Sequence, residues 1–101
     1  MYFIEAMNGP LDGKRWSFER DITIGRDERS VQAALTTDRA VSRRHAAITL
    51  EDGAFVLTDT GSSNGTIVAG QPITEPVLLQ IGQPFRIGAT TLRILDAREQ
   101  R

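Results

Sequence analysis

Apolar and polar residues alternate in short segments along most of the chain. Tyr2, Ile4 and Ala6 have this period of two near the start, and Phe85 with Ile87 repeats it near the end. A period of two places successive side chains on opposite faces of a strand, whereas a helix needs apolar residues three or four positions apart. The pattern therefore predicts strands and no long helix.

Turn-forming residues separate these segments at intervals of about 8 to 12 residues. The runs NGPLDG, EDG and AGQP supply Gly, Pro, Asn and Asp, which favour tight turns. The polar stretch 27–41 is expected to be mostly loop, with one short strand at 31–35. About eleven short strands at this spacing predict an all-β fold in which two sheets pack as a sandwich.

A chain of 101 residues has room for one hydrophobic core. We expect residues 1–96 to form that domain and residues 97–101 to be a polar tail. The final DAREQR is polar throughout, so we expect it to fray.

Composition excludes several classes of function. No apolar run approaches the 18 or so residues of a spanning helix, so membrane insertion is not expected. The absence of Cys and the single His exclude a thiolate nucleophile and metal sites built from Cys or several His, and no cofactor is indicated. The net charge of −1 disfavours nucleic acid as a partner. The start of the chain does not resemble a signal peptide, and we expect a cytoplasmic protein.

Three predicted loops contain the unusual polar residues: Gly25 with Arg26, the run 42–45, and the run 62–66. Strand alternation is expected to keep their side chains out of the core. Together they offer guanidinium groups, hydroxyls and an amide, with no carboxylate among the central members. This set of donors favours a bound anion over a metal or a general base.

The ordered motifs IGR, VSRRHA, TDTGSSNGT and FRIG resemble those of a forkhead-associated (FHA) domain, over Phe3 to Leu95. The resemblance implies an eleven-stranded β-sandwich whose loops bind phosphothreonine in extended peptides. It departs from the family at two turns, where Ala69–Gly70 replaces a frequent Asn-Gly and Gly82–Gln83 replaces a frequent Gly-Asp.

The resemblance also implies a role for individual residues. Arg26, Ser42, Arg43 and Ser63 match positions that contact the phosphate, and Asn64 matches the residue that binds the peptide backbone. Three others are expected to support the loops: Gly25, His45 and Gly65.

The implied function is a binding module, not an enzyme, that recognises a phosphothreonine-containing protein downstream of a Ser/Thr kinase. One alternative is an FHA-like interaction domain that binds its partner without phosphate. Another is a hydrolase that uses Ser42, His45 and either Asp38 or Asp59. The hydrolase is disfavoured because no GxSxG sequence surrounds Ser42.

Overall fold

The computed structural model of the chain describes residues 1–99, which form eleven strands and two 3-10 helices. The strands are β1 (Tyr2–Ala6), β2 (Arg15–Phe18), β3 (Asp21–Gly25), β4 (Ala33–Ala34), β5 (Ala46–Glu51), β6 (Ala54–Asp59), β7 (Thr66–Val68), β8 (Gln71–Pro72), β9 (Val77–Leu79), β10 (Phe85–Ile87) and β11 (Thr90–Asp96). The 3-10 helices are η1 (Gly9–Leu11) and η2 (Ala97–Glu99). No helix within residues 1–99 is long and apolar enough to cross a membrane.

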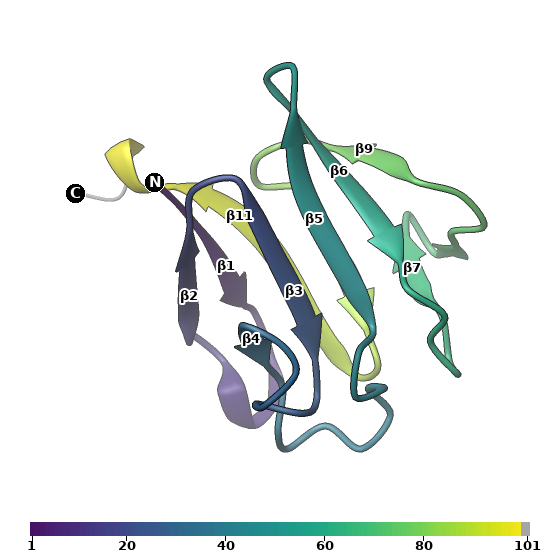
Figure 1. Cartoon of the computed structure of the whole chain (residues 1–101). Helices are drawn as coiled ribbons and strands as arrows, with labels where there is room; N and C mark the ends of the chain where they lie inside the picture. The colour runs from purple at the N-terminus through teal and green to yellow at the C-terminus, as the bar shows by residue number, and fades with distance from the viewer. Residues whose placement is uncertain (100–101) are drawn as a thin grey trace.

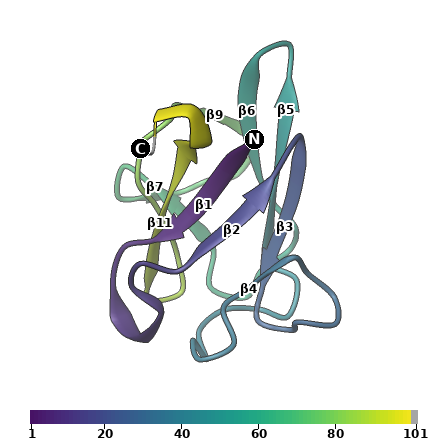
Figure 2. The ribbon, with the colours of Figure 1, turned by 90° about the vertical axis from the view of Figure 1, so that its left-hand side faces the viewer.

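The strands form two sheets, which confirms the predicted all-β sandwich (Figure 1). A six-stranded sheet has the order β2-β1-β11-β10-β7-β8, and a five-stranded sheet has the order β4-β3-β5-β6-β9. The short β3–β4 pair is parallel, and the other recorded pairs are antiparallel. β1 begins and β11 ends at the same end of the sandwich (Figure 2), where the N–H of Ala97 donates to the carbonyl of Met1 (3.1 Å).

The alternating apolar residues face each other between the sheets and form the core. Ile4, Ile48 and Ile94 are fully buried there. An aromatic cluster closes one part of the interface, because Tyr2 of one sheet meets Phe55 of the other edge to face, with ring centroids 4.9 Å apart. The core thus fixes the relative position of the strand ends from which the loops emerge.

Some local expectations differ from the structure. The strand expected at 31–35 is only two residues long, although Val31 and Leu35 are both buried. Gln71–Pro72 is a short strand, because the turn at AGQP occupies only its first two residues. The expectation that the polar end frays is wrong for Asp96, which is 4% exposed and accepts hydrogen bonds from the guanidinium of Arg98. Residues 100–101 of the expected tail lie outside the described residues.

Two hairpins have two-residue turns with positive φ at both positions. Asp52 and Gly53 have φ of 51° and 80°, and Ala69 and Gly70 have 52° and 78°. Turns of this kind match the strand twist and favour Asn or Asp before Gly, because Cβ crowds the following carbonyl oxygen in most other residues. Ala69 is therefore strained where Asp52 is not.

We expect Ala69→Asn to raise the free energy of unfolding by about 1 kcal/mol, because Asn tolerates the left-handed conformation better than Ala. Urea unfolding followed by tryptophan fluorescence measures the change. The matched control is Asp52→Ala, which should lower stability by a similar amount. An Ala69→Asn protein that unfolds at the same urea concentration as wild type would show that the turn is not strained.

Candidate functional site

Three loops meet at the end of the sandwich that lies away from the chain termini (Figure 1). They follow β3, precede β5, and connect β6 to β7. The backbone N–H of Arg26 donates to the carbonyl of Ser42 (3.0 Å), and the N–H of Asp27 donates to that of Arg43 (3.3 Å). The first two loops therefore continue side by side beyond the strands.

Gly25 allows this close approach. A Cβ at this position would lie 2.0 Å from the carbonyl oxygen of Arg43, which no other residue could avoid without moving the backbone. Gly25 thus brings the loop that contains Arg26 against the loop that contains Ser42 and Arg43.

His45 joins the second and third loops from inside the fold. Its side chain is fully buried, and Nδ1 accepts a hydrogen bond from the backbone N–H of Ser42 (3.0 Å). Because Nδ1 is an acceptor, the proton of a neutral ring is on Nε2, which donates to the carbonyl of Gly65 (2.8 Å). The expectation that strand alternation keeps these polar side chains out of the core is wrong for His45 and for Thr66, which is also fully buried.

Asp59 organises the β6–β7 loop. One carboxylate oxygen accepts from the backbone N–H groups of Gly61 and Ser62, and the other accepts from the hydroxyls of Ser62 and Thr66. Burial alone would raise the pKa of Asp59, but these donors outweigh it and lower the pKa to about 2. The loop is thus held by a carboxylate that stays ionised at neutral pH.

Ser42 and Asn64 connect the loops near the surface. The hydroxyl oxygen of Ser42 accepts from the backbone N–H of Ser63 (3.0 Å), which leaves the Ser42 hydroxyl proton free to donate. The side-chain amide of Asn64 donates to the carbonyl of Ala40 (2.9 Å). Its second N–H and its oxygen remain available to a ligand.

A shallow depression of about 590 Å³ lies between the three loops. Its lining includes the four residues that the sequence associated with an anion, Arg26, Ser42, Arg43 and Ser63. Asn64 is not part of this lining. Gly25, His45 and Gly65 also lie outside it, in the backbone and hydrogen bonds that hold the loops.

Four further residues line the depression: Asp27, Ser30, Arg44 and Gly61. Asp27 adds a carboxylate to the lining that the three predicted runs did not include. The hydroxyl of Ser30 and the backbone N–H of Arg29 donate to Asp27 and lower its pKa, so it is charged at neutral pH. The Asp-x-x-Ser spacing that begins directly after Arg26 was the available signal for this turn.

The guanidinium of Arg26 is incompletely satisfied. Within residues 1–99, its Nε is the one buried side-chain nitrogen or oxygen that has no hydrogen-bond partner. Buried donors without an acceptor cost about 1–3 kcal/mol, and more when they are charged. Arg26 also lines the depression, so a ligand with acceptor oxygens that enters it would meet this guanidinium.

The residues of the hydrolase alternative do not form a triad. Both ring nitrogens of His45 bind backbone groups, and the Ser42 hydroxyl accepts from Ser63 N–H. Asp59 binds within its own loop, and Asp38 binds Ala40, Ala89 and Thr90. The part of the chain that the structure describes also contains no group of three His, Cys, Asp or Glu side chains that could hold a metal ion.

The sequence matches the protein-family model of the FHA domain over residues 22–88, which include all three loops. The chain belongs to the FHA domain family. FhaB of Mycobacterium tuberculosis is 32% identical to this FHA domain over 91% of the chain, and the glycogen accumulation regulator GarA of the same organism is 38% identical over 91%. The chain spans 59% of the length of FhaB and 56% of that of GarA.

Solved FHA domains have the same architecture. The FHA domain of CT664 from Chlamydia trachomatis has a TM-score of 0.86 at 26% identity, and the match covers 94% of this chain and 96% of that one. A domain from a study of phosphothreonine-dependent FHA interactions has a TM-score of 0.77 at 27% identity, with 94% and 95% covered. Mycobacterium tuberculosis EmbR in complex with a phosphopeptide has a TM-score of 0.79 at 25% identity, with 93% and 24% covered.

We expect Asp59→Asn to destabilise the FHA domain and to change how its stability depends on pH. The pKa of Asp59 is about 2 in the folded protein against an ordinary value of 3.8, so its contribution is complete above about pH 4 and is lost as the pH falls toward 2. Thermal unfolding between pH 2 and 7 measures this. The difference between wild type and variant should shrink below pH 4.

The matched control is Asp21→Asn, because Asp21 is exposed at the start of β3. Its difference from wild type should be small at every pH. If the Asp59→Asn difference is also the same at pH 2 and pH 7, the β6–β7 loop does not depend on the ionised carboxylate.

Proposed function

We propose that this FHA domain is a phosphothreonine-dependent binding module that acts downstream of a Ser/Thr kinase. The observation that carries the proposal is the unpartnered, buried Nε of Arg26, whose guanidinium lines a depression rich in hydrogen-bond donors. A phosphate oxygen is a strong acceptor and suits a guanidinium in particular.

The charge of the depression fits a phosphate dianion. Arg26, Arg43 and Arg44 line it together with one carboxylate, that of Asp27, so the positive charges exceed the negative by two. A phosphorylated side chain has a charge of about −1.5 to −2 at neutral pH and three acceptor oxygens. The Ser42 hydroxyl and the Ser63 side chain add donors that need no charge.

Asn64 is placed to bind the peptide beside the phosphate. It lies directly after Ser63, which lines the depression, and its amide keeps free donor and acceptor capacity. A carboxamide can pair with both the N–H and the carbonyl of an extended backbone. We therefore assign the phosphate to Arg26, Ser42, Arg43 and Ser63, and the ligand backbone to Asn64.

The related proteins support this proposal. One structural neighbour was studied for phosphothreonine-dependent interactions, and EmbR was solved with a phosphopeptide. We infer that this chain likewise acts by binding and not by catalysis, on a phosphorylated partner protein. A cytoplasmic location goes with this role, because Ser/Thr kinases use the ATP of that compartment.

Arg26→Ala should weaken binding of a phosphothreonine peptide by about 2–3 kcal/mol, or roughly 30- to 150-fold, because a charge-assisted hydrogen bond is lost. Isothermal titration with a peptide selected from a degenerate phosphothreonine library measures the affinity. Arg26 is only half-buried, so its removal should leave the domain folded, which circular dichroism checks.

The matched control is Arg20→Ala, since Arg20 is exposed and lines a separate depression near the chain ends. This variant should bind within twofold of wild type. If folded Arg26→Ala protein also binds within twofold, Arg26 does not hold the phosphate.

Phosphothreonine should bind more tightly than phosphoserine, and an Asp substitute should not bind measurably. The threonine methyl contributes about 0.8 kcal/mol if it is buried, or roughly fourfold in affinity. A carboxylate brings one charge and two coplanar oxygens, so several donors of the site would stay unpaired. Titration of three peptides that differ only at this residue measures the series.

The affinity for the phosphothreonine peptide should also fall as the pH drops through about 6, where the phosphate takes up a proton. Equal affinity for the phosphorylated, Asp-containing and unphosphorylated peptides would instead favour the FHA-like domain that binds without phosphate.

A further inference from the structure

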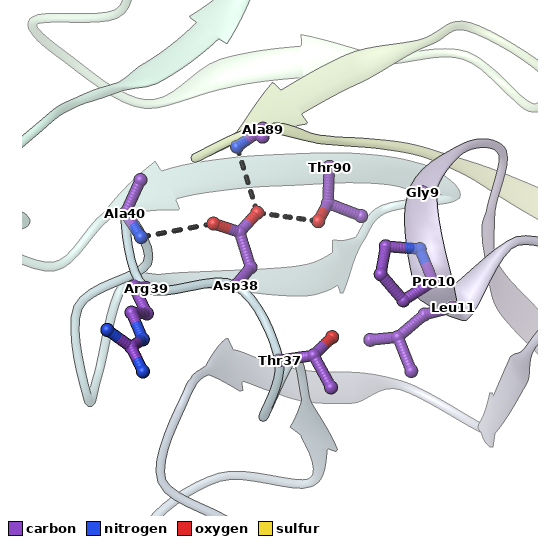
Figure 3. A pocket seen from close by; sticks show the side chains of 9 residues that line it. All are labelled: Gly9, Pro10, Leu11, Thr37, Asp38, Arg39, Ala40, Ala89 and Thr90. Atoms are coloured by element: carbon purple, nitrogen blue, oxygen red, sulfur yellow. Dashed lines mark hydrogen bonds between the residues drawn. The ribbon is translucent and has the colours of Figure 1, made fainter.

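Asp38 lies where the β4–β5 loop meets the turn between β10 and β11. One of its carboxylate oxygens accepts from the backbone N–H of Ala89 (2.8 Å) and from the hydroxyl of Thr90 (2.7 Å). The other accepts from the backbone N–H of Ala40 (3.1 Å). Figure 3 shows this carboxylate between the three donors, at the edge of a cavity of about 380 Å³. One side chain thus joins two segments that are about 50 residues apart in the sequence.

The turn is shaped to admit this carboxylate. A Cβ on Gly88 would lie 2.8 Å from both carboxylate oxygens of Asp38 and from a methyl of Val41. Thr90, which follows in β11, is 7% exposed, so its hydroxyl donates from a site that water hardly reaches. Hydrogen bonds in such surroundings are stronger than those at an open surface.

Side chains form hydrogen bonds with both the backbone N–H and the backbone carbonyl of Ala40. Asp38 accepts from the N–H of Ala40, and the side-chain amide of Asn64 donates to its carbonyl (2.9 Å). Ala40 is therefore the single residue that separates the carboxylate of Asp38 from the amide of Asn64. A displacement of the Ala40 backbone would remove the acceptor that orients Asn64.

We propose that Asp38 is a positioning residue for ligand binding: through Ala40, its carboxylate fixes the Asn64 amide in the orientation that binds the backbone of an extended phosphopeptide. This inference rests on the proposed function, because it assigns a role within the same site. Asp38 itself contacts no ligand. Its effect is on the peptide backbone and not on the phosphate, because Arg26 and Ser63 lie on other loops. Ser42 lies on the same loop as Asp38 but is held separately, by the ring of His45 and the N–H of Ser63.

Asp38→Asn tests this role with little change in shape. A carboxylate accepts on both oxygens, whereas a carboxamide must direct its N–H groups toward either Ala40 N–H or the donors of Ala89 and Thr90. On one side of the side chain, an N–H group of the carboxamide would then point at another donor instead of an acceptor. The core does not include Asp38, so the variant should remain folded.

Two probes separate backbone binding from phosphate binding: a degenerate peptide pool with a fixed phosphothreonine, and inorganic phosphate. Asp38→Asn should weaken binding of the peptide pool about tenfold, as Asn64→Ala should, and the double variant should be no weaker than Asn64→Ala. Binding of inorganic phosphate, followed by the amide resonances of Arg26 and Ser63, should stay within twofold of wild type. The side-chain amide resonances of Asn64 should shift in Asp38→Asn even without ligand.

Two variants serve as controls. Thr90→Val removes one donor to Asp38 but keeps the N–H of Ala89 and the contact with Ala40, so its loss for the peptide pool should be smaller than that of Asp38→Asn. Asp21→Asn removes an exposed carboxylate elsewhere and should have no effect. If Asp38→Asn does not fold, Asp38→Ala removes the carboxylate without adding opposed donors and should produce the same loss for the peptide pool alone.

Several results would overturn the role of Asp38. One is an equal loss of affinity for the peptide pool and for inorganic phosphate in Asp38→Asn. A second is a double variant in which the losses of Asp38→Asn and Asn64→Ala multiply. A third is a set of Asn64 side-chain resonances that does not change in Asp38→Asn. If wild type and Asp38→Asn bind the phosphorylated pool equally well, the role of Asp38 is wrong and the proposed function still stands. Wild-type protein that does not prefer the phosphorylated pool to an unphosphorylated one would overturn the proposed function, and the role of Asp38 with it.

Discussion

The buried ring of His45 is the contact on which the arrangement of the binding loops depends. It comes immediately before β5 and is fully enclosed, yet both ring nitrogens have backbone partners, in Ser42 and Gly65. A buried polar ring is tolerated only when its hydrogen bonds are made, so the two loops must lie where they satisfy it. The positions of the Ser42 and Gly65 loops at the surface thus follow from the need to satisfy the buried His45 ring.

Three carboxylates nearer the surface also order the loops by accepting hydrogen bonds. Asp59 gathers the donors of its own loop, Asp27 does so for the loop after β3, and Asp38 joins the β4–β5 loop to β11. Each of these carboxylates gathers donors from neighbouring backbone and hydroxyl groups and so fixes the path of its loop. Donors left without a partner at the depression include the Nε of Arg26 and the hydroxyl proton of Ser42. A loop cluster that is ordered before its ligand arrives loses less conformational entropy on binding.

Much of the fold could be predicted from the sequence, because alternation and turn chemistry are local. The β5–β6 hairpin with its Asp52–Gly53 turn is an example. The motifs also singled out Arg26, Ser42, Arg43 and Ser63, which the structure brings together at one depression. The contact of Asp38 with Ala89 could not be found in this way, since it depends on how the two sheets are packed. Likewise, the burial of Asp96 depends on its pairing with Tyr2 across β1 and β11, which polarity alone does not reveal.

β1 begins and β11 ends at the opposite pole of the sandwich from the loop cluster (Figure 2). Met1 and Ala97 are hydrogen-bonded there. Any polypeptide joined to either end would begin on the side away from the depression and would not have to cross it. The domain can therefore act as a tether: capture of a phosphorylated chain at one pole would hold whatever is attached at the other pole nearby. Two weakly interacting proteins would then meet at a local concentration set by the length of the connecting segment rather than by their abundance.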